Sequence, residues 1–103
     1  MKDGIVHVDS EIGNMIGFTS DKFTEDSYLW LTGKRMMISL IISREQGKGY
    51  LSALFHNIES LGLKIAVPTP FAHMQAILTK KGFVKHDEHS DDMDADVEVW
   101  EKP

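Results

Sequence analysis

The chain has 103 residues, a formal net charge of −5 and no cysteine. The length predicts a single domain over residues 1–103, whose core would bury roughly 60–70% of the unfolded surface. The lack of cysteine excludes disulfides, thiolate zinc sites and cysteine nucleophiles. Because the sequence shows neither a signal segment nor the ~20-residue apolar run of a membrane helix, we predict a cytoplasmic protein with no membrane partner.

From the N-terminus, the first 26 residues give mixed signals. Residues 4–8 are consistent with a short strand. Residues 10–18 fit either a helical turn or an irregular loop, because Gly13 and Gly17 argue against a long helix. Residues 19–26 are polar and predict a turn or a short helix.

A hairpin is predicted next. Residues 28–31 and 36–43 flank the turn sequence Thr32-Gly33-Lys34-Arg35. The second of these strands is apolar on both faces, which is typical of a central strand.

The segment Arg44-Glu45-Gln46-Gly47-Lys48-Gly49 follows this strand directly, and a helical apolar pattern begins at Tyr50. A strand, a glycine-rich turn and a helix N-terminus together favour an anion site. Arg44 and Lys48 add positive charge, while Gly47 and Gly49 let a phosphate approach the backbone. The spacing matches neither the P-loop nor the dinucleotide fingerprint.

Two helices are predicted after this turn. The first has an apolar stripe and an αL cap at Gly62; the stripe comprises Leu51, Leu54, Phe55, Ile58 and Leu61. A strand over residues 63–67 follows. The second helix has Thr69 as N-cap, Pro70 as its first residue and Gly82 at its end. Its predicted buried face comprises Phe71, Met74, Ile77 and Leu78.

The C-terminal segment predicts strands at residues 84–86 and 97–100, joined by an acidic loop. A calcium loop that starts at Asp92 would need Gly and Glu where Val97 and Pro103 stand. His86 and His89 with nearby carboxylates could hold a transition metal, but a solvated acidic hairpin is the simpler interpretation. We therefore predict no metal site.

The charges are unevenly distributed. Residues 1–33 carry a net charge of −4, residues 34–85 of +6 and residues 86–103 of −7. The basic middle would suit a phosphate-bearing ligand, although a chance placement of surface lysines explains it equally well. The acidic total disfavours nucleic-acid binding.

Arg-x-x-Gly-x-Gly between strand and helix, with a later helix that ends in Lys80-Lys81-Gly82-Phe83, resembles the GCN5-related N-acetyltransferase (GNAT) superfamily. The resemblance spans residues 34–100. It implies an α/β (α+β) fold, with a mixed central sheet, two main helices and the family's N-terminal helices reduced or missing. It also implies acetyl-CoA, with CoA as product, as a substrate for direct transfer to an amine.

Carried over by position, the resemblance places acyl-CoA along one continuous segment. The pyrophosphate would lie on N–H groups from Gln46 to Tyr50, and a backbone N–H near Ile41 or Ile42 would polarise the thioester carbonyl. The acyl-CoA-binding residues so implied are Ile41, Ile42, Ser43, Arg44, Gln46, Gly47, Lys48, Gly49 and Tyr50. The ring of Tyr50 either contacts the ligand or packs on the sheet.

The sequence departs from the family pattern at two positions. Leu78 stands where many members have the Tyr that protonates the thiolate, and Phe71 stands where an Asn is common. We therefore assign no catalytic residue. His73 lies near the expected thioester, at the border of the apolar face, and His56 is expected on the helix surface.

Two other functions stay open. The chain could be a non-catalytic GNAT-fold module, such as a phage virion protein or a host-targeting inhibitor, because Leu78 replaces the usual Tyr and the family's N-terminal helices have no clear counterpart. Compact versions of the fold occur in bacteriophages, and a phage protein would act in the host cytoplasm. The loop could also bind another phosphate ligand, such as a nucleotide. The acceptor amine or protein is unknown, and a homodimer is a further expectation.

Overall fold

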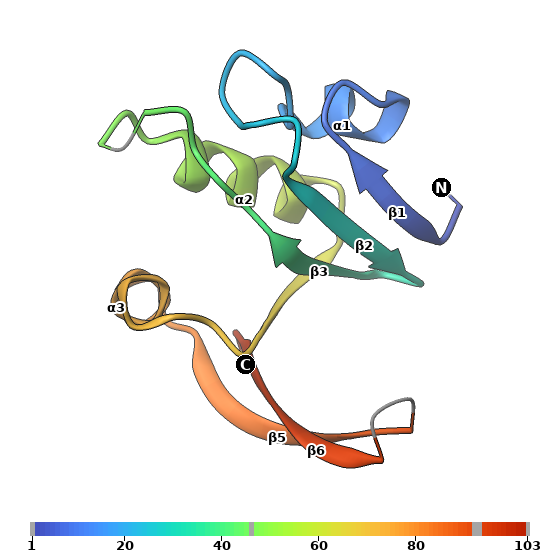
Figure 1. Ribbon diagram of the computed structural model, residues 1–103, viewed down its shortest axis with the longest axis vertical. Helices are drawn as coiled ribbons and strands as arrows, with labels where there is room; N and C mark the ends of the chain where they lie inside the picture. Colours follow the sequence, from blue (N-terminus) through green and yellow to red (C-terminus); the bar gives the residue numbers. More distant parts are fainter. Residues whose placement is uncertain (1, 46, 92–93, 103) are drawn as a thin grey trace. The chain divides into compact units, whose positions relative to one another are not determined.

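The computed structural model describes residues 2–45, 47–91 and 94–102. These residues form six strands and three helices, so the α+β class is confirmed. The chain divides into two compact units, Met1–Ile65 and Ala66–Pro103 (Figure 1). The single domain over residues 1–103 stays a prediction. None of the helices in the described ranges has the length and apolar character needed to cross a membrane.

The first unit contains an antiparallel sheet in the order β1-β2-β3. Its strands are β1 (Gly4–His7), β2 (Tyr28–Thr32) and β3 (Arg35–Leu40). Val6 pairs with Leu29, and Leu29 pairs with Ile38. These three side chains are buried. One face of the sheet therefore forms the core, and the predicted first strand and hairpin are confirmed.

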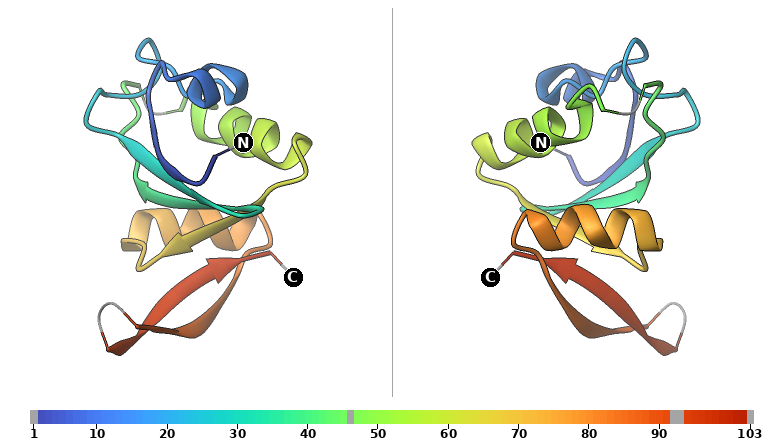
Figure 2. Two further views of the ribbon diagram at one scale, coloured as in Figure 1. Left: turned by 90° about the vertical axis from the view of Figure 1, so that its right-hand side faces the viewer. Right: turned by 90° about the vertical axis from the view of Figure 1, so that its left-hand side faces the viewer.

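Two helices, α1 (Glu11–Ile16) and α2 (Tyr50–Ser60), lie on the same side of this sheet (Figure 2). The Ser10 hydroxyl accepts a hydrogen bond from the Gly13 N–H at 3.0 Å and caps α1, which ends at Gly17 in the left-handed region. The region that the sequence left open is therefore a six-residue helix, and the N-terminal helical part is short, as predicted.

The apolar stripe predicted for α2 is largely confirmed. Leu54, Phe55 and Ile58 are buried. Leu61, however, is the C-cap residue and is 39% exposed, so its assignment to the stripe was wrong. The stripe ends there because the helix ends at Ser60, and Gly62 then adopts the predicted left-handed conformation (φ 79°).

The strand predicted to reach Ser43 ends at Leu40 instead. The next residues pair with the polar segment before β2: Ser43 forms an isolated antiparallel bridge with Phe23, and the Thr24 N–H donates to the Ile42 carbonyl at 2.9 Å. These new partners draw the chain away from the β2–β3 ladder.

The second unit contains antiparallel strands in the order β4-β6-β5, together with helix α3. The elements are β4 (Lys64–Pro68, which begins in the first unit), α3 (Ala72–Lys80), β5 (Val84–Ser90) and β6 (Ala95–Glu101). Leu78 is fully buried, as predicted for the apolar face of this helix.

Helix α3 begins later than predicted. Its N-cap is Phe71, not Thr69, because the Thr69 N–H donates to the Glu98 carbonyl at 2.8 Å and extends the pairing of β4 with β6. Phe71 is 87% exposed, so its assignment to the buried face was wrong. It lies ahead of the helix, where the helical spacing no longer applies.

The C-terminal hairpin is longer than predicted. Pairing is continuous from Val84 opposite Glu101 to Ser90 opposite Ala95. Asp87, Glu88 and Asp96, which were assigned to a loop, therefore lie on the strands. Sequence patterning predicted both strands but missed their extension, because the added residues are mostly exposed or polar.

Candidate functional site: a glycine-rich loop before helix α2

The predicted anion site is an exposed loop in the first unit, between the end of β3 and the start of α2. Gly47 and Gly49 have φ angles of 78° and 76°, in the left-handed region that glycine adopts without a steric penalty. A Cβ atom at either position would have no protein atom within 4 Å. The backbone conformation, rather than crowding within the protein, therefore accounts for glycine at both positions.

The loop leads straight into the N-terminus of α2. Gly49 is the N-cap residue, and as a glycine it provides no side chain to accept hydrogen bonds from the first-turn N–H groups. Its carbonyl accepts the Ala53 N–H at 3.0 Å. The helix end carries partial positive charge, which favours an anion beside the loop.

Arg44 fixes the start of the loop to the segment before β2. Its backbone N–H donates to the Lys22 carbonyl at 2.8 Å, and its Nε donates to the Ser20 carbonyl. The Ser20 N–H in turn donates to Asp9 at 3.0 Å. The side chain and backbone of Ser20 lower the pKa of Asp9 by hydrogen bonding to its carboxylate. Arg44 thus combines a positive charge with an anchoring role.

Ser27 is a second anchor, which the sequence did not indicate. It is fully buried, and its hydroxyl accepts the Ile42 N–H at 2.9 Å. The family resemblance implies that the N–H of either Ile41 or Ile42 polarises the thioester carbonyl. The Ile42 N–H already donates to Ser27. The N–H of Ile41, a half-buried residue, is therefore the other candidate donor.

The remaining predicted residues differ in their surroundings. Lys48 Nζ lies 3.8 Å from Glu45, and both side chains are 60% exposed, so this pair restrains the cation only weakly. Tyr50 is half-buried, and its ring lies edge-on to Phe23 with 6.4 Å between centroids. Ser43 provides the bridge to Phe23. Gln46 lies outside the described residues.

Phe23 is another supporting residue that the sequence analysis passed over. It is fully buried, and its ring lies 5.4 Å from that of Phe18. Two phenylalanines in an otherwise polar stretch were the available signal. They give the segment before β2 a core of its own, against which the loop is held.

Three positions that bear on acid–base chemistry lie on helices α2 and α3. Leu78 is a buried hydrocarbon side chain and offers no proton. His73 on α3 and His56 on α2 are both exposed, and for His56 this confirms the predicted surface position. The loop therefore combines features that favour a negatively charged ligand, and we assign no acid or base to it.

No protein-family model matches the sequence, and no curated protein matches it significantly. A solved structure with a similar fold is that of a putative acetyltransferase from Agrobacterium tumefaciens. The similarity covers 98% of this chain and 74% of that one, with a TM-score of 0.52 and 13% sequence identity. At this identity the likeness establishes a shared fold, and the expected GNAT-like architecture agrees with it.

Proposed function

We propose that this protein is a GNAT-type N-acyltransferase, which transfers an acetyl group from acetyl-CoA to an amine. The observation that carries the proposal is the open loop with left-handed Gly47 and Gly49 at the N-terminus of α2. The fold shared with the putative acetyltransferase from Agrobacterium tumefaciens supports it.

In this proposal the loop binds the CoA pyrophosphate. Bare backbone at Gly47 and Gly49 admits the phosphate oxygens to the helix N-terminus. Lys48 and Arg44 contribute positive charge, and Arg44 keeps the loop in place through the Ser20 and Lys22 carbonyls. Recognition therefore depends mainly on the backbone.

The amine nitrogen attacks the thioester carbonyl carbon; the C–N bond forms as the C–S bond breaks. The Ile41 N–H would stabilise the developing oxyanion, because the Ile42 N–H donates to Ser27. The amine loses its proton to water, and CoA departs as the thiolate. Because a thiolate is a tolerable leaving group, that departure is feasible without an acid at Leu78.

The second candidate is a non-catalytic binding module of the same fold. Buried Leu78, at the position where many family members have tyrosine, favours it. A phage origin and a nucleotide ligand remain further hypotheses.

Calorimetric titration of the chain with acetyl-CoA, CoA and ATP tests the proposal, followed by assays of acetyl-CoA turnover with a panel of amines. We expect acetyl-CoA and CoA to bind, ATP to bind weakly, and turnover to disappear in Gly47→Trp. At 100 times its dissociation constant a ligand adds about 2.7 kcal/mol of stability, a thermal shift of several degrees. Binding without turnover would favour the second candidate, and no binding of CoA would refute the first.

A further inference from the structure

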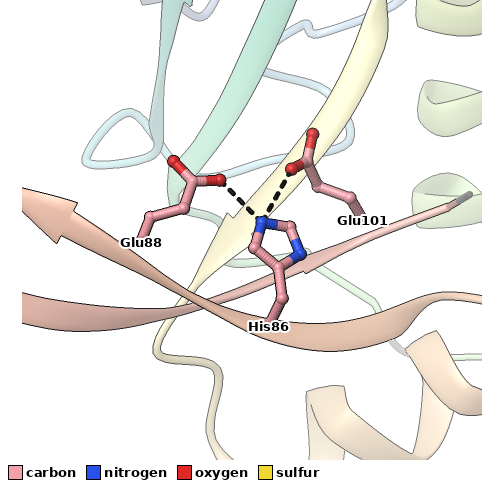
Figure 3. A group of neighbouring side chains, drawn as sticks. All are labelled: His86, Glu88 and Glu101. Atoms are coloured by element: carbon pink, nitrogen blue, oxygen red, sulfur yellow. Dashed lines mark hydrogen bonds and ion pairs between the residues drawn. The ribbon is translucent and has the colours of Figure 1, made fainter.

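The C-terminal hairpin brings three side chains of metal-binding types together on one face. His86 and Glu88 are separated by one residue on β5, so their side chains lie on the same face of the hairpin, and Glu101 lies on β6. His86 is paired with Val99, two residues from Glu101. Figure 3 shows both carboxylates directed toward the same imidazole ring.

Both carboxylates approach the same nitrogen atom, Nε2 of His86. His86 Nε2 lies 2.7 Å from Glu88 Oε2 and 3.2 Å from Glu101 Oε1. The three ligand atoms all lie within 4.8 Å of one another. A cation shared by two carboxylates held this close would reduce the repulsion between them.

We propose that His86, Glu88 and Glu101 bind a divalent transition metal ion, with Zn²⁺ as the best match. One imidazole nitrogen and two carboxylate oxygens are a donor set that zinc accepts, and three protein ligands leave a coordination position for water. The net charge of −7 over residues 86–103 adds long-range attraction for a cation.

The ligand positions need only small adjustment to fit the ion. Zinc–ligand distances of about 2.0–2.1 Å place neighbouring ligand atoms of a tetrahedral site roughly 3.3 Å apart. The present separations from His86 Nε2 are 2.7 and 3.2 Å. The side chains are 42% exposed for His86, 36% for Glu88 and 21% for Glu101, so a bound ion would keep contact with water.

His89, on the opposite face of the same hairpin, is a matched control. It also has two acidic neighbours, but its Nε2 lies 3.6 Å from Asp91 and its Nδ1 lies 3.4 Å from Asp96. Because the two carboxylates face different ring nitrogens, they do not converge on one ion. Both histidines therefore have two acidic neighbours, but only at His86 do the two carboxylates approach the same ring nitrogen.

Calorimetric titration of the full, untagged chain with Zn²⁺ tests the proposal. Since even the loss of a partner behind a metal ligand costs 10–100-fold in affinity, we expect His86→Gln and Glu101→Gln each to weaken binding by at least about tenfold. His89→Gln should retain wild-type affinity. Far-UV circular dichroism checks that each variant is folded, and Glu88→Gln replaces any variant that is not.

Three results would overturn the proposal: no Zn²⁺ binding by the wild type, unchanged affinity in folded His86→Gln, or an equal loss in His89→Gln. The outcome is independent of the proposed acyltransferase function, because the titration contains no CoA and the three ligands lie outside the loop at residues 41–49.

Discussion

The loop at residues 41–49 and the β5–β6 hairpin are two candidate ligand sites with opposite construction. The loop offers backbone N–H groups and a helix end to an anion, and its side chains serve partly as anchors. The hairpin offers side chains to a cation on a regular backbone. Ligand binding by a backbone site depends on the φ and ψ angles of its residues. Binding by side chains on paired strands depends instead on which residue types stand at the positions that the strand register brings together.

The substitution Gly49→Val should distinguish the two sites most clearly. A β-branched residue at a φ of 76° is strongly disfavoured, and its side chain would occupy the open space beside the helix N-terminus. We expect acetyl-CoA binding to fall by about 100-fold, the loss of roughly 2.7 kcal/mol, with Zn²⁺ binding unchanged. Calorimetry measures both.

Gly33→Val is the matched control for strain. Gly33, in the β2–β3 turn, also has a positive φ (60°) and open space around a Cβ. It should lose comparable stability and keep acetyl-CoA binding. Equal losses of binding in the two variants would contradict the backbone site.

Ser27→Ala should have the next largest effect. It removes the acceptor of the Ile42 N–H and leaves that part-buried donor unsatisfied, at a cost of about 1–3 kcal/mol in the free energy of unfolding. Urea denaturation measures the cost, and acetyl-CoA affinity should fall with it. Ser60→Ala, whose exposed hydroxyl donates to the His56 carbonyl, should change stability by less than about 0.5 kcal/mol. Similar losses of unfolding free energy in the two variants would contradict the anchoring role of Ser27.

Lys48→Gln should have a smaller effect, because its exposed charge supplements a backbone site. A unit charge about 4 Å from a phosphate in water is worth about 1 kcal/mol, so we expect a roughly fivefold lower acetyl-CoA affinity at low salt. The difference should shrink at high salt, where exposed charges are screened. Lys80→Gln on α3 is the control. If Lys48→Gln lowered acetyl-CoA affinity as much as Gly49→Val, the loop would bind its ligand mainly through side chains, contrary to our proposal.

The smallest expected effect is that of Asp9→Asn, whose carboxylate is linked through Ser20 to Arg44. Hydrogen bonding by Ser20 lowers the pKa of Asp9 below its ordinary value of 3.8. The ionised form therefore stabilises the fold above pH 3.8, and this contribution is lost as pH falls through the lowered pKa.

Asparagine tolerates the φ of 61° at this position, so the substitution removes mainly the charge. Urea denaturation from neutral to acid pH should show a wild-type advantage that disappears toward low pH. A difference that is constant with pH would argue against the linkage.

Periodic segments were predictable from sequence because one face of each is buried. The apolar pattern of Leu54, Phe55 and Ile58 placed α2, and the two apolar runs on either side of the turn at residues 32–35 placed the β2–β3 hairpin. Glycines that end helices were equally informative, since Gly62 adopts the left-handed conformation that its position indicated.

What the sequence did not reveal depends on partners distant along the chain. The strand ending at Leu40 depends on the pairing of Ser43 with Phe23, and the late start of α3 depends on the bond from Thr69 to Glu98. The convergence of Glu101 on His86 depends on the register of β5 with β6. Local patterns carry none of this information.

The order β4-β6-β5 leaves β5 as an edge strand, paired with β6 along one side. Exposed strand edges are templates for self-assembly, and charged side chains oppose it. Lys85, Asp87 and Glu88 lie along this edge. The charges of β5 therefore oppose aggregation by strand addition at this edge.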